Sequence, residues 1–416
     1  MDEWTRRPSW ELPRGRLVWD RRPGVPRSAA HRAALTLPQA VCTDASSLAV
    51  VLLMPMTSST PVILGIETSC DETAAAVVAG TGQILSSILT SQHDVHAKYG
   101  GVVPELAARR HIETIEVLVK TALEQARLDW TDIHAVAATR GPGLAGALLV
   151  GVSYGKALAY ALRIPLIGVH HLEGHVASAW INRPDVPFPC VVLVVSGGHT
   201  HLYLAESDDR FELLGHTLDD AAGEAFDKAA AMLALGFPGG PAIDRVARSG
   251  NPEAVWFPRP YAKPGNLDFS FSGLKTSLRY YLRDLDRAGS SRPVSDIAAG
   301  FQEAIVDVLV TKTFNAAHRC GVKTVAVVGG VSANSRLRTR LAQRAHTEGA
   351  LLALPDPVYC TDNAAMIAAA GLRAYRRGHV ASWEMEAEAG LAFPALSRLR
   401  TRGASGKHRK PLTQPA

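Results

Sequence analysis

Two histidines four residues apart are the first side chains in this 416-residue sequence whose spacing suggests chemistry. They are His171 and His175, in the stretch HHLEGH at residues 170–175, and a helix would turn both imidazoles to one side. In the zinc-protease signature H-E-x-x-H the general base directly follows the first histidine. Here Glu173 stands two places on, roughly opposite the pair, which favours metal binding and argues against a peptidase. The plain alternative is a histidine-rich helix start with satisfied hydrogen bonds.

The composition is that of a globular protein long enough for two or three domains. Apolar residues make up 47% of the chain and charged residues 20%. The five cysteines are scattered without a C-x-x-C pair, which favours reduced thiols in the cytoplasm over a disulfide framework. The net charge of +5 arises at the two ends, because residues 61–394 taken alone are slightly acidic. Charge therefore gives no argument for a nucleic-acid-binding core.

The two ends of the chain differ from the region between them. Residues 1–60 are rich in Arg, Pro, Trp and Ser, and we expect a disordered extension with Met54 or Met56 as the candidate translation start. Residues 395–416 are basic and contain no acid, and we expect a disordered tail there. No segment reaches the ~20 apolar residues of a membrane-spanning helix, so no membrane association is expected.

The region between the ends alternates strands and helices in a pattern that repeats. Each half opens with a three-strand meander, at 62–90 and at 190–217, and continues with helices and a further strand. This repetition predicts a duplicated α/β domain with a cleft between two lobes. The further predicted helices are at 104–127, from the glycine turn 141–143 to about residue 162, at 219–235 and at 362–378. The further predicted strands are at 134–140 and at the start of the stretch 323–334.

Each half also contains a glycine turn directly after an apolar strand, at residues 196–198 and at Gly329-Gly330. Glycine lets backbone amides approach an anion closely, so these turns predict phosphate contacts, with ordinary tight turns as the alternative. Neither turn matches G-x-x-x-x-G-K-[ST] or G-x-G-x-x-G, which excludes P-loop and Rossmann sites. The residues thus predict a cleft for a nucleotide or an adenylate.

Ten motifs between about Val62 and Pro394 occur in the order of a known family. They are LGIETSCDET, GGVVPELAARRHIE, TRGPGLAGALLVG, GVHHLEGH, VVSGGHTHL, DDAAGEAFDKAA, GFPGGPAID, DFSFSGLKT, GGVSANSRLR and CTDNAAMIA. The sequence resembles the bacterial and organellar branch of the tRNA adenosine threonylcarbamoyltransferases, formerly described as O-sialoglycoprotein endopeptidases. The resemblance implies two ribonuclease-H-like lobes of the actin/hexokinase/Hsp70 (ASKHA) superfamily, formed by residues 61–169 plus 363–394 and by residues 170–362.

The resemblance also implies a reaction and its partners. The threonylcarbamoyl group would pass from threonylcarbamoyl-adenylate to the N6 amine of adenosine 37, next to the anticodon, in tRNAs that read codons beginning with A. AMP would leave. One divalent metal per subunit is implied, Fe²⁺ with Zn²⁺ as the alternative. The implied partners are a shorter paralogue of the same fold and a small P-loop ATPase.

Site residues follow from the same resemblance. His171, His175 and Asp362 match the metal ligands, although Asp362 would also suit a helix N-cap. Asp71 and Glu72 match an acidic catalytic pair, in which Asp71 would orient or deprotonate the incoming amine. An ion-paired surface carboxylate is the alternative for Asp227, and a plain cap for Asn334. The implied adenylate contacts are Val194, Val195, Ser196, Gly197, Gly198, Asp227, Gly240, Asp244 and Asn334.

Three other functions compete with this interpretation. A metalloprotease would need a general base beside the metal. A sugar or acetate-type kinase of the same superfamily would not require the metal set, and an inactive scaffold would not require complete metal and adenylate motifs. For tRNA, we expect a candidate basic helix face in Arg336, Arg338, Arg340 and Arg344, with a solvated face as the alternative. The apolar helix at 143–162 suits either a partner interface or the core.

Overall fold

The computed structural model describes residues 60–99, 101–259, 265–393 and 395–396. The expected N-terminal extension up to residue 59, and the tail from residue 397, lie outside the described residues. The prediction that the tail begins at residue 395 is wrong for its first two residues. Ala395 and Leu396 form the short strand β11, which pairs in parallel with β8.

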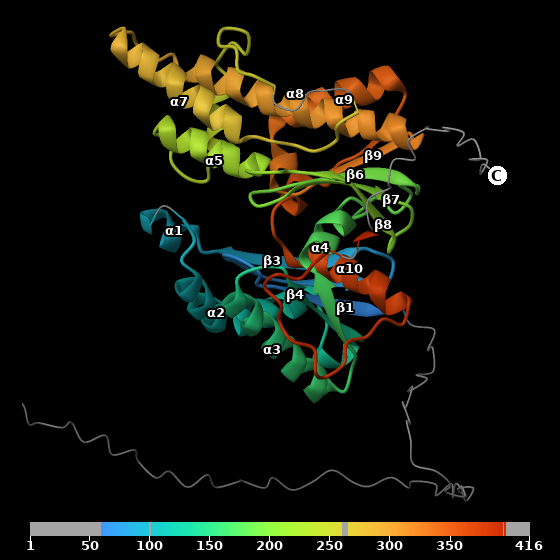
Figure 1. Cartoon of the computed structure of the whole chain (residues 1–416). Coiled ribbons are helices and arrows are strands. Elements are labelled where there is room, and N and C mark those ends of the chain that lie inside the picture. The colour runs from blue at the N-terminus through green and yellow to red at the C-terminus, as the bar shows by residue number, and fades with distance from the viewer. Residues whose placement is uncertain (1–59, 100, 260–264, 394, 397–416) are drawn as a thin grey trace, which may run out of the picture. The chain divides into compact units, whose positions relative to one another are not determined.

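The first lobe is a five-stranded sheet in the order β3-β2-β1-β4-β5 (Figure 1). The meander β1–β3 is antiparallel, and β4 and β5 continue in parallel with β1. Helices α2 and α3 cover one face of the sheet and α10 covers the other. Because both faces are buried, the strands are apolar throughout and do not alternate apolar with polar residues. The elements are β1 Val62–Glu67, β2 Glu72–Ala79, β3 Ile84–Ser91, α1 His93–His96, α2 Pro104–Ala126, β4 Ala135–Gly141, α3 Ala145–Leu162, β5 Leu166–His170 and α10 Ala364–Arg376.

The second lobe repeats this topology. Its sheet has the order β10-β9-β6-β7-β8-β11, in which β8-β7-β6-β9-β10 reproduces the strand order of the first sheet. The meander β6–β8 is again antiparallel and β9 is again parallel to the first strand, so the predicted duplication is confirmed. The elements are β6 Cys190–Val195, β7 Thr200–Ala205, β8 Phe211–His216, α5 Ala222–Met232, α6 Gly239–Ala247, α7 Ser272–Arg287, α8 Val294–Cys320, β9 Thr324–Val328, α9 Ser335–Glu348 and β10 Leu351–Ala353.

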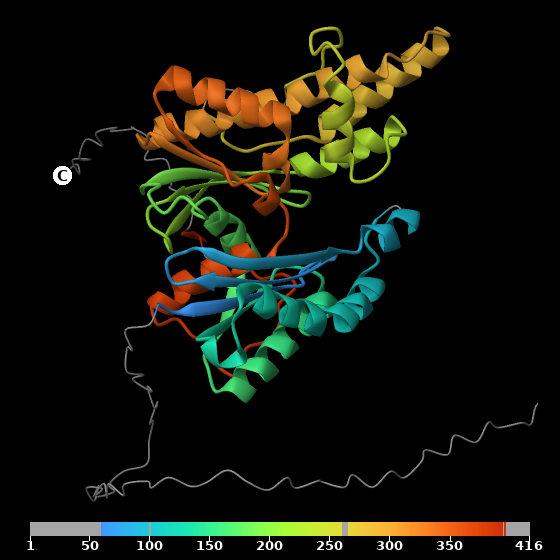
Figure 2. The ribbon, with the colours of Figure 1, turned by 180° about the vertical axis from the view of Figure 1, so that it is seen from behind.

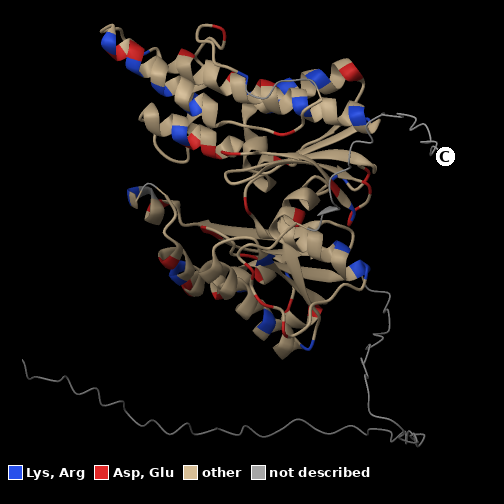
Figure 3. Cartoon of the chain, viewed as in Figure 1, with Lys and Arg blue, Asp and Glu red and all other residues tan. Residues whose placement is uncertain are grey.

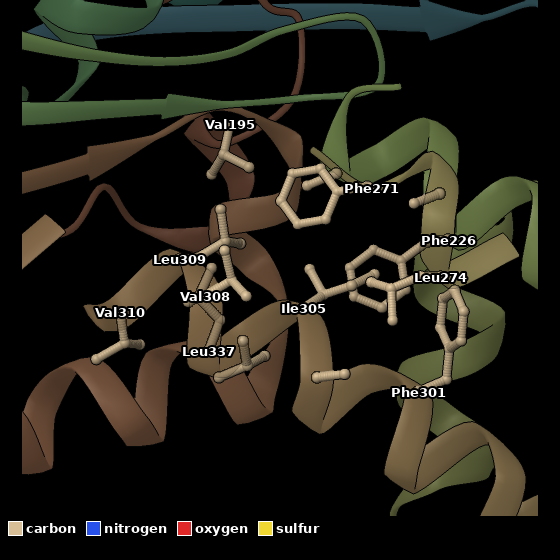
Figure 4. Close-up of a cluster of buried hydrophobic side chains, with 14 of the residues drawn as sticks. Val195, Phe226, Phe271, Leu274, Phe301, Ile305, Val308, Leu309, Val310 and Leu337 are labelled. Carbon is tan, nitrogen blue, oxygen red and sulfur yellow. The ribbon is translucent and has the colours of Figure 1, made fainter. Parts of the chain in front are cut away.

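Helix α8 forms the centre of the second-lobe core because it is apolar on most of its surface. Figure 4 shows Phe301 and Ile305 of α8 among Phe226 of α5, Leu274 of α7 and Val195 of β6. All five side chains are buried. Burying a side chain of this size contributes roughly 1.5–3 kcal/mol, so this core can hold the helices on the cleft side of the lobe in fixed positions.

Two helices, α4 (His171–Ser178) and α10, lie between the sheets and pack against each other (Figures 1 and 2). Leu172 and Val176 of α4 contribute to the core of the second sheet, whereas Ala177 contributes to the first. This helix therefore belongs to both lobes, although residues 170–362 were predicted to form the second lobe alone. The two histidines in its first two turns, His171 and His175, are therefore fixed from two sides.

The segment after α10, residues 379–393, connects the lobes a further time. It first follows the first sheet, where Ala381 N donates to Leu166 O at 2.8 Å and Gly143 N to Ala389 O at 3.1 Å. The Phe393 ring then packs on the rings of Tyr203 and Phe211 in the second lobe, just before β11. This segment was predicted to belong to the first lobe alone.

Among the described helices, only α3 has the length and apolar composition to cross a membrane. A single such helix is weak evidence for a membrane span. Its inner side packs on the first sheet through Val152 and Ala159. Its outer side leaves Leu149 and Tyr160 exposed. The helix is thus only partly a core helix and has an apolar outer face.

Candidate active site

Two histidines of α4 and the aspartate that precedes α10 meet between the lobes. Nε2 of His175 lies 3.1 Å from Oδ1 of Asp362, and Nε2 of His171 lies 3.5 Å from the same oxygen. One possible ligand atom from each of the three residues lies within 4.8 Å of the others. The predicted metal set is therefore brought together, although Asp362 is far from the histidines in sequence.

Local structure explains why these side chains converge. The chain enters α4 directly after β5, so both histidines fall in the first two turns on one side of the helix. The N-cap of α10 is Asn363, whose Oδ1 accepts a hydrogen bond from Met366 N at 2.9 Å. Capping is thus performed by Asn363, and the carboxylate of Asp362 is left to face the histidines.

The three residues fit a divalent metal. His175 is fully buried, and neither of its ring nitrogens makes a hydrogen bond of normal geometry within the described residues, despite the short approach to Asp362. Buried polar atoms without a partner are costly, and a cation at this point would satisfy one of them. Two imidazole nitrogens and a carboxylate oxygen are a common donor set for Fe²⁺ and Zn²⁺.

A buried glutamate, Glu67 at the end of β1, holds His171 from behind. Its Oε2 lies 3.2 Å from Nδ1 of His171 and accepts a hydrogen bond from Thr139 Oγ1 at 2.8 Å. With Nδ1–H donating to the carboxylate, Nε2 is turned toward Asp362. The sequence analysis missed Glu67. The available signal was a lone acid at the end of a strand that is otherwise apolar.

The charges in this cluster shift one another's pKa values. Burial alone would lower the pKa of His171, but the carboxylates of Asp362 and Glu67 outweigh it and raise that pKa to about 9. Burial would raise the pKa of Asp362, yet His171 and His175 hold it well below its usual range. The site is therefore a strongly coupled set of opposite charges.

The acidic turn between β1 and β2 faces the same region. Burial, together with the charges of Asp362 and Asp71, raises the pKa of Glu72 to about 9. Burial also raises the pKa of the Cys70 thiol far above its ordinary value, so this cysteine stays a neutral thiol and a poor nucleophile. At neutral pH the side chain of Glu72 is therefore a protonated carboxyl group that can donate a hydrogen bond.

A buried histidine of α2, also missed by the sequence analysis, clamps this turn. Nε2 of His111 donates to Cys70 O at 3.0 Å, and its Nδ1 accepts from Thr73 Oγ1 at 2.7 Å. Gln92 N donates to Asp71 O at 3.0 Å. Burial lowers the pKa of His111, which agrees with the neutral ring that these bonds require. Each side of the turn is therefore fixed by a hydrogen bond.

A cavity of about 740 Å³ lies between the acidic turn of the first lobe and the second lobe. Aromatic side chains from the two lobes meet at its wall, where His93 of α1 stacks on Phe237 with ring centroids 5.7 Å apart. Neither ring was singled out in the sequence. The predicted site residues that line the cavity are Asp71, Glu72, Gly197, Asp227, Gly240, Asp244 and Asn334.

The predicted phosphate loop packs on the start of α5. Gly223 N donates to Ser196 O and Glu224 N to Gly197 O, both at 3.2 Å. A Cβ at Gly197 or Gly198 would meet no atom within 4 Å, so a ligand can approach the backbone there. The side chains of Val194 and Val195 are fully buried in the cores. Those two residues can meet a ligand only through their backbone.

Four further residues that were predicted to contact the adenylate lie in the second-lobe wall of the cavity, and three of them make hydrogen bonds within the protein. Asp227 Oδ1 accepts from Gly239 N at 2.7 Å, and burial raises the pKa of this carboxyl, so it is no ion-paired surface charge. Asn334 caps α9 by accepting from Leu337 N at 3.0 Å, as its plain alternative predicted. Asp244 accepts from Ser335 Oγ at 2.7 Å. A Cβ at Gly240 would meet open space.

Two competing expectations have clear positions in the structure. Glu173 points away from the metal set into a different cavity that it shares with Arg377, so no general base stands beside the histidines on α4. The basic face of α9 is neutralised by acids or bound to carbonyl groups. The acceptors are Glu303 for Arg336, Glu303 and Asp307 for Arg340, Glu348 for Arg344, and carbonyl oxygens for Arg338.

Comparison with known sequences shows a consistent likeness. A family model described as tRNA N6-adenosine threonylcarbamoyltransferase matches residues 83–369. A protein of that name from Syntrophotalea carbinolica is 53% identical over 309 residues, covering 74% of this chain and 90% of the relative. Another from Desulfitobacterium hafniense is 49% identical over 338 residues, covering 81% of this chain and 99% of the relative.

Comparison with solved structures supports the fold alone. Full-length HypF in a phosphate- and nucleotide-bound form aligns with a TM-score of 0.52 at 15% identity, over 78% of this chain and 48% of HypF. HypF from T. kodakarensis aligns with a TM-score of 0.50 at 14% identity, over 79% of this chain and 49% of that one. The two-lobed architecture is thus shared with proteins of very different sequence.

Proposed function

The chain belongs to the tRNA N6-adenosine threonylcarbamoyltransferase family, and from this premise we propose that it transfers threonylcarbamoyl from threonylcarbamoyl-adenylate to adenosine 37 of tRNA, releasing AMP. Activity in tRNA threonylcarbamoyl modification follows from the family itself. The observation that carries the finer proposal is a cavity that joins the acidic turn of the first lobe to the open glycine loop of the second. The metal set lies next to it, since Thr361, the residue before Asp362, lines the same cavity.

The proposed step is an acyl transfer. The N6 nitrogen of adenosine attacks the carbamoyl carbonyl carbon, a C–N bond forms, and the C–O bond to phosphate breaks. AMP leaves with the electron pair, and the amine loses a proton to a basic group. Because the adenylate is already a good leaving group, the protein must mainly position the reactants, stabilise charge and exclude water.

The second-lobe wall would bind the adenylate. The amides of Gly197 and Gly198 have open space beside them and suit the phosphate. Asp227 suits the ribose hydroxyls, while Gly240 and Asp244 border the space left for the base. The bound adenylate would then present its carbonyl to the first lobe.

The first-lobe turn would receive the amine. The pKa of Glu72 is raised to about 9, so at neutral pH this carboxyl group already holds its proton and suits hydrogen-bond donation to a reacting group. We assign to Asp71 the orientation or deprotonation of the incoming amine, with Glu72 beside it. His111 holds this turn through Cys70 O and Thr73 Oγ1.

We propose one divalent metal, Fe²⁺ or alternatively Zn²⁺, held by His171, His175 and Asp362. Such an ion supplies Lewis acidity or a template for the donor when it is bound. The chain's own contribution is the orientation of the ligands, in which Glu67 fixes the ring of His171.

The proposed partners are tRNA, a shorter paralogue of the same fold and a small P-loop ATPase, and the proposed compartment is the cytoplasm. The outer faces of α2 and α3 would receive the paralogue, because they expose apolar side chains. These are Ile112, Val117, Leu149 and Tyr160, between 58% and 72% exposed. If these side chains form one contiguous patch, it would suit a protein interface.

The test is single-turnover transfer of labelled threonylcarbamoyl from the adenylate to a tRNA transcript that reads an A-initial codon, with the partners present. The wild type should label the tRNA, and His175→Ala should lose both metal content and transfer. Glu173→Gln, on the same helix but outside the metal set, is the matched control and should retain both. A metal-loaded wild type that transfers nothing, beside an active relative, would refute the proposed reaction.

A further inference from the structure

Helix α7 carries a stripe of cations along its exposed side. Lys275, Arg279, Arg283 and Arg287 recur every four residues, and all four are exposed. Each step along the helix axis is about 6 Å, so the stripe is about 18 Å long. Leu274, Leu278 and Leu282, one position earlier in each turn, are buried in the second-lobe core. Because these leucines anchor α7 in the core, the opposite side of the helix presents the cations to solvent in a fixed orientation.

Most of this positive charge has no acidic partner. Arg283 pairs with Asp284 at 2.9 Å, whereas no carboxylate among the described residues lies within ion-pair distance of Lys275, Arg279 or Arg287. The contrast with α9 is direct, since Glu303, Asp307 and Glu348 neutralise three of its four arginines. Figure 3 shows the Lys and Arg positions along α7. The stripe can thus attract an external polyanion.

An exposed aromatic ring lies within the stripe. Tyr280 is 46% exposed, and the guanidinium groups of Arg279 and Arg283 stand 5.9 Å and 4.7 Å from its ring centroid. Aromatic and guanidinium planes are the groups on which unpaired bases of single-stranded RNA stack. Lysines and arginines alone would fit any polyanion, but this mixture favours RNA over an acidic protein.

The stripe begins close to the proposed cleft. Asp219 fixes the start of α7 by accepting hydrogen bonds from Phe271 N at 2.8 Å and from Ser272 Oγ at 2.8 Å. Asp219 lies three residues before α5, whose first amides hold the glycine loop at Ser196. One short segment thus ties the stripe to the cavity wall. RNA lying along α7 would place neighbouring nucleotides beside the cleft.

We propose that the α7 stripe, formed by Lys275, Arg279, Arg283 and Arg287 with Tyr280, binds the phosphate backbone and unpaired bases of the tRNA substrate. This inference rests on the proposed function, because it assigns the docking surface for the same acceptor. The stripe acts in binding only and takes no part in the acyl transfer.

The test compares two matched double variants in the full-length, metal-loaded protein. Lys275→Gln/Arg279→Gln removes one lysine and one arginine from the stripe. Lys323→Gln/Arg319→Gln removes the same two residue types from exposed positions in the last turn of α8 and in the loop that follows it. Neither residue has an acidic partner among the described residues. Affinity for the tRNA transcript is measured by fluorescence anisotropy across a salt series, with thermal unfolding as the folding check.

The stripe variant should bind tRNA roughly tenfold or more weakly near physiological salt. Its slope of log affinity against log salt should fall by about 1.5, since each lost phosphate contact removes roughly 0.7–0.9. The control variant should keep both values. At saturating tRNA, the stripe variant should transfer threonylcarbamoyl at the wild-type rate, and its affinity for the adenylate should not change.

The possible failures can be told apart. Wild-type transfer together with an unchanged affinity and salt slope in the stripe variant would overturn the α7 surface alone, as expected if the stripe binds an acidic protein instead. Weakened binding in the stripe variant supports the surface even if no transfer is seen. Absence of both transfer and tRNA binding in the wild type would overturn the inference and the proposed function together.

Discussion

The two lobes share one topology but carry different chemistry at matching positions. In each lobe, a glycine after the fourth strand packs against the end or the turn of the first strand. A Cβ on Gly143 would lie 2.5 Å from Ser69 O, and one on Gly329 would lie 2.5 Å from Val195 O. The turn after the first strand differs between the lobes. In the first lobe it contains Asp71 and leads into Glu72, and in the second it contains Gly197 and Gly198.

The helices after the last strand of each lobe also correspond. Helix α4 follows β5 and brings His171 and His175, whereas α10 follows β10 and is preceded by Asp362. The metal set is thus assembled from equivalent positions of both lobes. The two lobes therefore share a duplicated frame and differ in their turns, and in the proposed function one turn serves the donor and the other the acceptor.

The largest effect is expected from the acidic turn. Asp71→Asn should slow single-turnover transfer about 100-fold, a typical loss for a general base or for an orienting carboxylate. Adenylate affinity should stay near the wild-type value, because the adenylate is assigned to the other lobe. Asp94→Asn, an exposed acid on α1, serves as the control for charge in the same lobe. A large loss of adenylate affinity in Asp71→Asn would contradict the division of labour between the lobes.

The second prediction concerns the support behind the metal set in the first lobe. Glu67→Gln should reduce metal affinity about 10- to 100-fold, the usual cost of losing a carboxylate behind a histidine ligand. Competition with a chelator measures this directly. The equivalent end of β6 is Val195, so Val195→Ile should leave metal affinity unchanged. Equal losses in both variants would mean that general packing, and not the carboxylate, sets the affinity.

The third prediction concerns the glycine turn of the second lobe. Gly197→Ala should weaken adenylate binding about tenfold, because a Cβ would occupy the space where a phosphate approaches the amide. The thermal midpoint should not move, since that Cβ meets no protein atom. Gly273→Ala is the matched control, with equally open space outside the cavity. Calorimetry with the adenylate or a stable analogue gives the result, and unchanged affinity would exclude the loop from the donor site.

The smallest effect concerns stability in acid. Strand β2 of the first lobe is mainly Ala and Val, but the matching strand β7 contains His201, whose buried Nδ1 has no hydrogen-bond partner among the described residues. Burial, with a smaller contribution from His216, lowers the pKa of His201 to about 4. Below pH 6.5 the unfolded chain then binds more protons than the folded one, so stability falls as the pH drops toward 4.

His201→Gln should therefore reduce the loss of unfolding free energy between pH 7 and pH 5. The expected reduction is about 1 kcal/mol, less than the full shift implies because the ring is partly exposed. Urea unfolding at the two pH values measures it. The same pH dependence in variant and wild type would show that this histidine does not titrate differently in the two states.

Much of the fold was predictable because its signals are local. The two meanders and helices α2, α3, α5 and α10 follow from apolar runs, glycine turns and helical periods. The short strand β5 and the helices α6 to α8 were not predicted, since their apolar patterns are brief or continuous on all sides. The pairing of His171 with His175 was predicted from their spacing, and the place of Asp362 beside them from the resemblance.

The supporting residues were not predictable for a different reason. Glu67 acts on His171 across 104 residues of sequence, and His111 acts on Cys70 across 41. Such contacts depend on strand register and helix rotation, which no short pattern records. The pairing of the α9 arginines with α8 also needed the packed structure, because each helix alone shows only a charged face.

The three passages of the chain between the sheets have a mechanical consequence. One passage leads from α4 to β6, another from β10 to α10, and the third is the segment at 379–393 that ends in β11. Three crossings beside two packed helices restrict the rotation of one lobe relative to the other more than a single crossing would. We therefore expect the mouth of the cleft, where His93 stacks on Phe237, to open mainly by movement of these two rings and their loops.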